Sequence, residues 1–368
     1  MKKRVLVGLS GGVDSAMTAK ILIDQGFDVS GITMSIWDDS VDLKESTKSG
    51  CYGPGEKDDL EAAAKVCAEL GIPHHIIRLQ DEYRDNVLSY FCDTYVSGQT
   101  PNPCLICNQR MKFGYLPAKA RAMGLDFDYF ATGHYARISH NPASGRYELR
   151  KAIDPSKDQS YFLSFLRQEQ LSNLIFPLGA KTKEEVKALA RVLGFEDLAA
   201  KQESQDFFES DDYSLLFADG TFQAGEIVDT SGKVLGTHKG LIFYTIGQRR
   251  NLGIPGQIEP YYVIRIDAAA NRLVVGPQSL LYGEDCTVQN LNWLSIPEPD
   301  HEFTASARIR LQHNPAPCTV KRLDSGNWQV LFNEPQLSIT PGQGIVFYRD
   351  DLVLAGGIIN QTNTKENL

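Results

Sequence analysis

The sequence predicts an α/β fold in which a parallel-sheet domain is followed by a small β-rich central domain and a C-terminal β-barrel. The first third alternates short apolar runs with helical patterns, which is typical of a parallel sheet covered by helices. After about residue 201, short strands between Gly, Pro and Asn turns replace the helices. A chain of 368 residues that is 42% hydrophobic can form more than one core. We expect domains at residues 1–203, 204–274 and 275–368.

The elements of the first domain follow from its apolar runs and from the residues that end them. Strands are expected at 4–9, 28–34, 74–79 and 129–132, and helices at 14–25, 58–70, 110–123, 159–170 and 182–193. A hairpin is expected from 136 to 151, with its turn at 141–145. In the later domains, residues 225–229 and 234–236 flank a Ser-Gly-Lys turn and predict a second hairpin. Further strands are expected at 261–266, 272–275, 319–323 and 328–332.

Charge and hydropathy exclude two classes of protein. The formal net charge is −9, from 37 basic and 46 acidic residues, which argues against a polycation that coats nucleic acid. No apolar run approaches the roughly 18 residues of a membrane span. The basic start, Met1 to Arg4, precedes a short apolar run that leads directly into Ser10-Gly11-Gly12. We therefore expect a core strand rather than an export signal, and a cytoplasmic protein.

A glycine- and serine-rich loop follows the first strand and opens the first helix. Its glycines allow close approach of the backbone to a phosphate, and the helix N-terminus directs free N–H groups at the anion. Asp14 can hold Mg²⁺ or fix the loop. No Gly-Lys-Ser/Thr follows, so this is not a Walker loop. It resembles the PP-loop ATP site, whose enzymes cut ATP between the α- and β-phosphates. The expected ATP-binding residues here are Gly8, Leu9, Ser10, Gly11, Gly12, Val13, Asp14 and Ser15.

Two residues at the ends of other strands are expected to complete the nucleotide site. Met34 ends the second strand and would pack against the adenine. Gly133 follows the strand at 129–132, where it permits close backbone approach, and His134 comes next. The carboxyl ends of parallel strands form the usual ligand crevice of such sheets.

The cysteines divide into two groups. Cys67, Cys92, Cys286 and Cys318 stand singly and are expected to be buried small hydrophobes. Cys104 and Cys107 form a C-x-x-C at the expected head of a helix, a position that lowers a thiol pKa. Structural cysteines, a redox dithiol, a zinc site and an iron–sulfur site all remain open for them. Cys51, in a glycine-rich loop, is a third thiol near the same sheet edge, and three thiolates suit a [4Fe–4S] cluster with one open iron.

Seven motifs in order give the chain a resemblance to the tRNA-specific 2-thiouridylases of the MnmA type, nearly end to end. They occupy residues 8–15, 100–113, 131–135, 157–161, 203–205, 244–250 and 308–310. The resemblance implies an ATP-dependent enzyme that adenylates the C2 oxygen of the wobble uridine in tRNAs for Lys, Glu and Gln. Sulfur then displaces AMP to give 2-thiouridine. ATP and Mg²⁺ are the implied cofactors.

The resemblance also implies roles for individual residues. Cys107 matches the cysteine nucleophile, and Cys104 and Asp14 are further catalytic candidates. The implied tRNA contacts are Asn102, Pro103 and Cys104 at the target base, Lys157, Asp158 and Gln159 in a loop, and Arg310 and Leu311 in the barrel. Arg249 is added because the motif around it would hold its cation rigidly. Lys181, Lys183 and Lys187 recur on one helix and are expected to form a solvated face.

The sequence departs from the family pattern at the second catalytic cysteine, the relay thiol. Phe208 stands where the second catalytic cysteine follows the Ser-Gln motif, and Cys104 stands where an aspartate is usual. We therefore expect Cys51, Cys104 and Cys107 to hold a [4Fe–4S] cluster that delivers sulfur, with a Cys104–Cys107 persulfide–disulfide pair as the alternative. A second departure is Leu311 in place of a tyrosine. The sulfur would come from a relay protein, a cysteine desulfurase or free sulfide.

Two rival functions remain in view. Another PP-loop ligase, such as an amidating synthetase, would share the phosphate loop but has no need of a C-x-x-C beside it. A non-catalytic iron–sulfur protein that binds tRNA would have no need of an intact loop from Ser10 to Ser15. Neither membrane nor DNA is expected as a partner.

Overall fold

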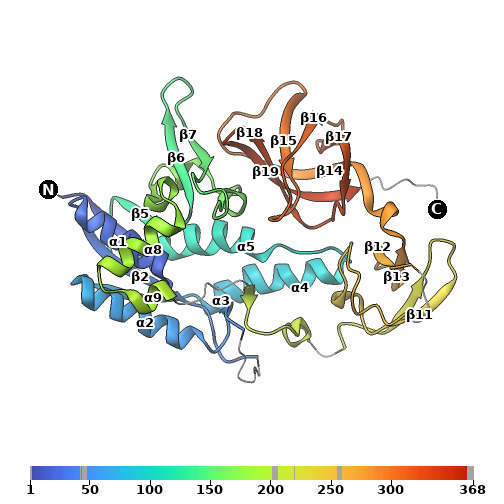
Figure 1. Cartoon of the computed structure of the whole chain (residues 1–368), viewed down its shortest axis with the longest axis horizontal. Coiled ribbons are helices and arrows are strands. Elements are labelled where there is room, and N and C mark those ends of the chain that lie inside the picture. Colours follow the sequence, from blue (N-terminus) through green and yellow to red (C-terminus); the bar gives the residue numbers. More distant parts are fainter. Residues whose placement is uncertain are drawn as a thin grey trace.

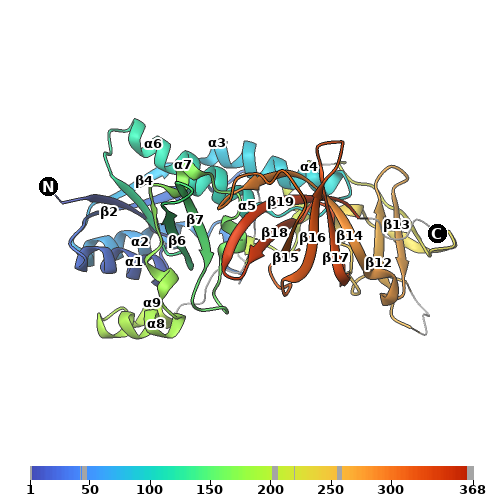
Figure 2. The same cartoon turned by 90° about the horizontal axis from the view of Figure 1, so that it is seen from above.

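The computed structural model confirms the expected order of an α/β domain, a β-rich central domain and a C-terminal barrel (Figure 1). It describes residues 2–41, 43, 48–200, 206–218, 220–254 and 259–362. The α/β domain and the central domain lie at opposite ends of the molecule, and the barrel lies between them in both views (Figures 1 and 2). Among the described helices, none is both long and apolar enough to cross a membrane.

The α/β domain is built on a parallel sheet with strand order β4-β2-β1-β5-β8. The strands are β1 (Arg4–Gly8), β2 (Asp28–Ser35), β4 (His74–Arg78), β5 (Tyr129–Thr132) and β8 (Leu174–Ile175). The first four match the expected strands within a residue, and β8 was not expected. The chain runs from β1 outward to β4 and then returns to β5 on the other side of β1. The carboxyl ends of β1 and β5 therefore flank the switch point at which such sheets bind ligands.

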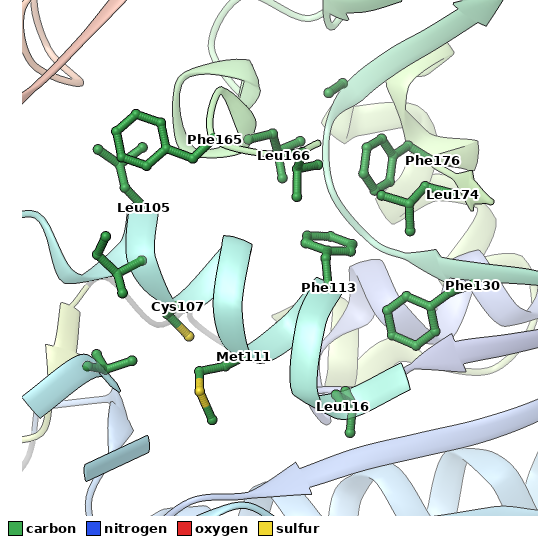
Figure 3. Close-up of a cluster of buried hydrophobic side chains, with 14 of the residues drawn as sticks. Leu105, Cys107, Met111, Phe113, Leu116, Phe130, Phe165, Leu166, Leu174 and Phe176 are labelled. Carbon is green, nitrogen blue, oxygen red and sulfur yellow. The ribbon is translucent and has the colours of Figure 1, made fainter. Parts of the chain in front are cut away.

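The side chains of β1 point alternately to the two faces of the sheet, and each face packs in a different hydrophobic cluster. Val5 and Val7 pack with α1 (Val13–Asp24) and α2 (Glu56–Leu70), whereas Leu6 packs on the opposite face. That face is covered by a long irregular helical region. Its parts are α3 (Gln80–Tyr83), α4 (Ser89–Val96), α5 (Pro103–Ile106) and α6 (Leu116–Ala122), with π-helical turns at Arg84–Leu88 and Cys107–Tyr115. Figure 3 shows the apolar side chains of the Leu105–Leu116 helix facing those of β5 and β8.

Three expectations for this domain need correction. The helix expected at 110–123 begins at Pro103, and the helical region at 80–96 was not expected. The single helix expected at 159–170 is instead a 3₁₀ turn, Ser160–Leu163, followed by the short α7 (Gln168–Leu171). In that turn the Tyr161 hydroxyl donates to the Gly344 carbonyl of the barrel at 3.0 Å, a contact that ties the turn to a distant part of the chain. The helix expected at 182–193 is present as α8 (Lys183–Val192), with α9 (Glu196–Ala200) after it.

A small parallel pair joins segments far apart in the sequence. Here β3 (Gly50–Tyr52), which carries Cys51, pairs with β9 (Asp206–Phe208) in the register Gly50↔Asp206 and Tyr52↔Phe208. The Glu209 carboxylate then accepts the Gly55 N–H at 2.9 Å. A Cβ at Gly53 or Gly55 would lie 2.4 Å from that carboxylate, so the two glycines allow the loop to close over Glu209. The loop that bears Cys51 is therefore fixed by the chain near residue 208.

The remaining strands form two further sheets. The central domain has the order β11-β10-β13-β12, from β10 (Gly225–Val228), β11 (Val234–His238), β12 (Tyr262–Asp267) and β13 (Arg272–Gly276). The barrel has the order β14-β17-β16-β15-β18-β19 and is closed by pairing of β19 with β14. Its strands are β14 (Tyr282–Trp293), β15 (Phe303–Arg308), β16 (Ala316–Arg322), β17 (Trp328–Leu337), β18 (Gly344–Arg349) and β19 (Leu352–Thr362).

The hairpin of β6 (Ala136–Asn141) and β7 (Arg146–Lys151) connects the α/β domain to the barrel. Strand β7 meets β19 at the pair Arg150↔Leu352. The Asp351 carboxylate binds the guanidinium groups of Arg137 and Arg150 at 2.7 and 2.8 Å. The hairpin thus extends the barrel sheet while its sequence position lies within the first domain.

Candidate active site

A cavity of about 330 Å³ opens at the carboxyl ends of β1, β2 and β5. Nine of the ten residues expected to bind ATP lie on its wall: Gly8, Leu9, Ser10, Gly12, Val13, Asp14, Ser15, Met34 and Gly133. His134, Gln159, Lys112 and Cys51 also lie on this wall. The cavity therefore combines a phosphate-type loop with a cation, an imidazole and a thiol.

The tenth residue, Gly11, shapes the loop from behind. It adopts φ +69°, and a Cβ there would lie 2.6 Å from the Asp59 carbonyl oxygen. The Ser15 hydroxyl accepts the Ser10 N–H at 3.2 Å and donates to the Gly12 carbonyl at 3.0 Å, which holds the loop curled. No described side chain caps the N-terminus of α1. Its N–H groups therefore remain directed at an anion in the cavity.

Asp14 is held by two partners from distant parts of the chain. The Tyr135 hydroxyl donates to Asp14 Oδ1 at 2.8 Å, and Lys183 Nζ lies 2.7 and 2.8 Å from the two carboxylate oxygens. Lys183 is 5% exposed, so the expected solvated lysine face is wrong at this position. The first residue of α8 instead points inward and places a buried counter-charge behind the loop. Of the two roles expected for Asp14, this arrangement supports fixing the loop.

Close backbone approach at Gly133 joins β5 to the phosphate loop. A Cβ at Gly133 would lie 2.8 Å from the Asp14 carbonyl carbon and 2.9 Å from the Ser15 nitrogen. The next residue, His134, shares a hydrogen bond of 2.7 Å between its Nδ1 and the Thr132 hydroxyl. Burial, and then the nearby Lys112 ammonium, hold the pKa of His134 well below its ordinary value. The imidazole facing the cavity is therefore neutral at pH 7.

The three candidate thiols lie within electrostatic reach of one another and of Lys112. The Lys112 ammonium interacts with Cys107, Cys51 and Cys104, and it lines the nucleotide cavity together with Cys51. Cys104 and Cys107 reach this place from the helix that forms one cavity wall. In Figure 3 the Cys107 and Met111 side chains extend from the same side of that helix. Of the three thiols, Cys51 lies on the cavity wall with the phosphate loop, whereas Cys104 and Cys107 pack on the sheet face that carries Leu6 and meet the cavity through Lys112.

The expected lowering of the thiol pKa at the helix head is wrong. Burial raises the pKa of the Cys104 thiol to about 12 and that of Cys107 to about 11, and in both the Lys112 cation opposes the rise. Desolvation of the thiolate outweighs both the helix N-terminus and one cation. The two thiols are therefore protonated at neutral pH in the protein without a metal.

The position of the missing relay thiol is part of the core. Phe208 is fully buried and stacks on Tyr52 at a centroid distance of 6.3 Å, with Phe207 and Tyr213 beside it. Because Tyr52 pairs with Phe208, Cys51 lies one residue away from that position on the neighbouring strand. The Glu203-Ser204-Gln205 motif lies outside the described residues.

The residues expected to contact tRNA occupy four places. Arg249 is exposed at the end of a turn in which the Thr245 N–H donates to the Gln248 side chain and that side chain donates to the Arg250 carbonyl. Lys157, Asp158 and Gln159 are partly exposed, but the Asp158 carboxylate is used internally, by the Ala152 N–H at 3.1 Å and the Ser160 hydroxyl at 2.9 Å. Arg310 and Leu311 follow β15 in the barrel, and Asn102 and Pro103 precede Cys104.

The described residues contain no group of three or more His, Cys, Asp or Glu side chains arranged so that it could hold a metal ion. The donor set formed by Cys51, Cys104 and Cys107 is nevertheless all-thiol, which is the chemistry of iron–sulfur ligation. A cuboidal cluster needs ligands spread more widely than those of a single ion, and the three cysteines lie on two separate elements. The described residues therefore offer no mononuclear metal site, and the three thiols suit a cluster by their chemistry.

Three members of the site, Lys183, Tyr135 and Lys112, were not expected from the sequence. Lys183 could have been recognised because a lysine in the first turn of a helix is unfavourable to the helix dipole unless it has an anionic partner. Tyr135 and Lys112 lie inside recognised motifs, but nothing in the sequence around them indicates that their side chains belong to the site. Their roles depend on contacts across the domain.

The parallel sheet, the glycine-rich phosphate loop and the adjoining thiols together define an adenine-nucleotide enzyme of the PP-loop class. Three family models match most of the chain in order: a tRNA methyl transferase HUP domain at residues 3–208, a tRNA methyl transferase PRC-barrel domain at 216–277, and an aminomethyltransferase beta-barrel domain at 284–359.

Curated relatives agree over nearly their full length. The chain is 44% identical to the tRNA-specific 2-thiouridylase MnmA of Endomicrobium trichonymphae, over 97% of this chain and 98% of that one. It is 41% identical to that of Acetivibrio thermocellus, over 97% and 99%, and 44% identical to that of Trichormus variabilis, over 98% and 99%. The chain belongs to the MnmA family of tRNA-specific 2-thiouridylases.

Proposed function

We infer that the protein is a tRNA-uridine 2-sulfurtransferase that binds ATP in the cavity at the carboxyl ends of β1, β2 and β5. The observation that carries this function is that the phosphate-binding loop shares its cavity with Cys51 and with Lys112, whose ammonium interacts with Cys51, Cys104 and Cys107. A ligase that used ammonia would gain nothing from thiols at this place.

The reaction divides into an activation and a substitution. The C2 oxygen of uridine attacks the α-phosphorus of ATP, the bond to the β-phosphate oxygen breaks, and pyrophosphate leaves with the N3 proton of the base. Hydrosulfide sulfur then attacks C2, the C2–O bond breaks, and AMP leaves with the oxygen. The hydrosulfide proton returns to N3, so atoms and charge balance over the two steps. A urea-type oxygen is a poor leaving group, and for that reason activation must come first.

The residues of the chain act mainly by holding the reactants. The N–H groups at the start of α1 and the Ser10 hydroxyl face the phosphates. Gly12 and Gly133 allow the backbone to approach the nucleotide, and Met34 offers an apolar contact for adenine. Asp14 faces the same space and is positioned by Lys183 and Tyr135. Mg²⁺ would accompany ATP through its phosphate oxygens.

We propose that Cys51, Cys104 and Cys107 hold a [4Fe–4S] cluster. When bound, such a cluster would supply an open iron that carries sulfide. The Lys112 cation would offset the negative charge of three thiolates, and Phe208 leaves no thiol for the usual relay. The alternative is a persulfide on Cys107 that is resolved by Cys104.

Further assignments are proposed from family membership. The target is the wobble uridine of tRNAs for Lys, Glu and Gln, and the enzyme acts in the cytoplasm. Asn102, Pro103 and Cys104 would contact the base, while Lys157, Gln159, Arg249, Arg310 and Leu311 would contact the rest of the tRNA. Sulfur would come from a relay protein, a desulfurase or free sulfide.

The function is tested by incubating the protein, purified without oxygen, with tRNA, ATP and sulfide. We expect 2-thiouridine in the digested tRNA and one AMP per thiolated base. Release of AMP without thiolated tRNA, or thiolation independent of ATP, would reject the assignment.

The sulfur route is tested separately by assay of iron and acid-labile sulfide. We expect both in the wild type and their loss in Cys51→Ala, whereas Cys92→Ala is the matched control and keeps them. A colourless, iron-free protein that still thiolates tRNA would reject the cluster in favour of the persulfide pair.

A further inference from the structure

The segment that leads to the C-x-x-C cannot hold itself in place. Pro101 and Pro103 have no N–H group, so residues 99–104 cannot form a regular ladder of their own. Their carbonyl groups need donors from elsewhere, because buried carbonyls left without partners are costly. Thr100 is 8% exposed, so water does not meet this need.

The barrel supplies these donors through one side chain. Gln343 Nε2 donates to the carbonyl oxygens of Thr100 at 3.2 Å and Pro101 at 2.9 Å. The Thr100 N–H in turn donates to the Pro341 carbonyl at 2.9 Å. Three hydrogen bonds therefore join the 338–343 turn of the barrel to the two residues that precede Asn102.

The turn that carries Gln343 is itself fixed to the barrel. The Gly342 N–H donates to the Ile359 carbonyl at 2.8 Å, and the Ile359 N–H donates to the Gln343 carbonyl at 2.9 Å. A Cβ at Gly342 would lie 2.7 Å from the Thr100 oxygen, so glycine permits the close approach of the two segments. The position of Thr100 is thus set by strand β19.

Contacts on either side extend the same junction. Tyr161 is fully buried, donates its hydroxyl to the Gly344 carbonyl at 3.0 Å, and accepts the Asn102 side-chain amide at 3.5 Å. From the central domain, the Thr245 hydroxyl lies 3.4 Å from that of Thr100. Figure 1 shows the chain between α4 and α5 running back from the side of the central domain, beneath the barrel, to α5.

The other end of the turn meets a residue proposed to bind tRNA. Arg310 donates through Nη1 to the Leu337 carbonyl at 2.9 Å. Leu337 directly precedes the turn, and Ser338 follows with φ +55°. A single short turn therefore separates the carbonyl bound by Arg310 from the side chain that holds Thr100 and Pro101.

We propose that Gln343 is a positioning residue for tRNA thiolation: it fixes the target-base segment, residues 100–104, to the barrel surface that carries Arg310. The place at which the barrel binds the tRNA would then determine where the uridine enters the active site. The proposal rests on the proposed function, because it takes Asn102–Cys104 as the base contact.

The test compares Gln343→Leu with Gln329→Leu in the full chain. Gln329 donates to Asp285 at 2.9 Å within the barrel and does not contact the segment, so it is a matched control. We expect Gln343→Leu to lower kcat for thiolation about tenfold with the KM for ATP unchanged. Gln329→Leu should stay within about twofold of wild type. Equal losses in the two variants would mean a merely structural role and overturn the proposal.

Hydrogen exchange and a double variant give further readouts. Amides of residues 99–105 should exchange faster in Gln343→Leu than in Gln329→Leu, and this arm needs no turnover. If Arg310→Ala alone also costs about tenfold, the double variant with Gln343→Leu should lose about tenfold rather than a hundredfold, because both changes break one linkage. Additive losses, or unchanged exchange, would overturn the proposal. Failure of the wild type to thiolate tRNA would reject the proposed function. The exchange measurement would still show whether Gln343 fixes residues 99–105.

Discussion

At the residue scale, the Lys183–Asp14 pair explains how an acidic side chain can face a triphosphate. Asp14 is partly exposed to the cavity, and its charge opposes that of ATP. Lys183 lies behind it at 2.7 Å and offsets this charge, while Tyr135 fixes the orientation. Breaking a buried pair on one side leaves an uncompensated charge, which is more harmful than removing both partners.

We therefore expect Lys183→Met to raise the KM for ATP by about tenfold or more, because Asp14 would then repel the phosphates. The double variant Asp14→Asn with Lys183→Met should recover part of that loss. Lys187→Met, on the same helix, serves as the control with an unchanged KM. Steady-state release of pyrophosphate measures all three, and a Lys183→Met enzyme with normal KM would contradict the electrostatic role.

The buried His134 predicts a dependence of stability on pH. Its pKa in the folded protein lies well below the ordinary 6.5, so between these values the unfolded chain binds a proton that the native state does not. Stability should therefore fall as the pH drops below about 6.5. In His134→Gln the decline in stability should be less steep, by the amount that one bound proton contributes. The measurement is Tm between pH 7.5 and 5. Because burial also lowers the pKa of His74 and His313, part of the decline should remain. An identical slope in the variant would refute this assignment.

At the element scale, the pairing of β3 with β9 shows how the chain places Cys51 beside the former relay position. The two strands are three residues each and lie about 150 residues apart in the sequence. Phe208 points into an aromatic cluster rather than into the cavity. A cysteine introduced there should not create a relay, because the side chain at this position is buried among aromatic rings.

The variant Phe208→Cys should lose about 3 kcal/mol or more of stability through the cavity that it creates. We expect no gain in thiolation and no disulfide between residue 208 and Cys107. Urea unfolding and mass spectrometry of the oxidised protein check the two statements. A Phe208→Cys protein that thiolates tRNA after Cys51 is replaced would show that the relay geometry survives.

The sequence could predict those elements that depend on local pattern. The strands β1, β2, β4 and β5, the helices α1, α2 and α8, and the hairpin β10–β11 all arise from short-range periodicity and turn residues. The pair β3–β9 escaped prediction because each strand is too short to show a pattern, and its partner is remote. The helix expected at 159–170 is interrupted because Tyr161 reaches Gly344 in the barrel, which no local pattern reveals.

The site residues also divide into those that the local sequence predicts and those that depend on packing between distant parts of the chain. The residues from Gly8 to Ser15 except Gly11, together with Met34 and Gly133, lie at predicted strand ends and line one cavity. Lys183 was assigned to solvent because three lysines at helical spacing are typical of an exposed face. Only the packing of α8 against α1 shows that its first residue points inward. The pKa values of Cys104 and Cys107 likewise depend on burial, which the motif does not specify.

At the scale of the whole molecule, an acidic protein must bind a polyanion through a few arranged cations. The net charge of −9 opposes tRNA, so we expect binding to rest on a few cations, among them the proposed contacts Arg249 and Arg310. Affinity should fall steeply as salt is raised.

We expect Arg249→Gln to weaken tRNA binding and to reduce the slope of log Kd against log salt by about one. Arg272→Gln is the control, because Arg272 is already paired with Glu226 at 2.9 Å. Filter binding between 50 and 200 mM salt measures both slopes. Equal slopes in the two variants would remove Arg249 from the tRNA surface.

The junction of β7 with β19 has a consequence for synthesis of the chain on the ribosome. Strand β7 is complete about 200 residues before its partner Leu352 is made, which at about 5–20 residues per second means roughly 10–40 s. During that interval its outer edge stands open to any other strand. Arg146, Glu148 and Arg150 alternate along it, and such charges discourage mispairing. These charges therefore protect the open edge of β7 from mispairing until β19 has been synthesised.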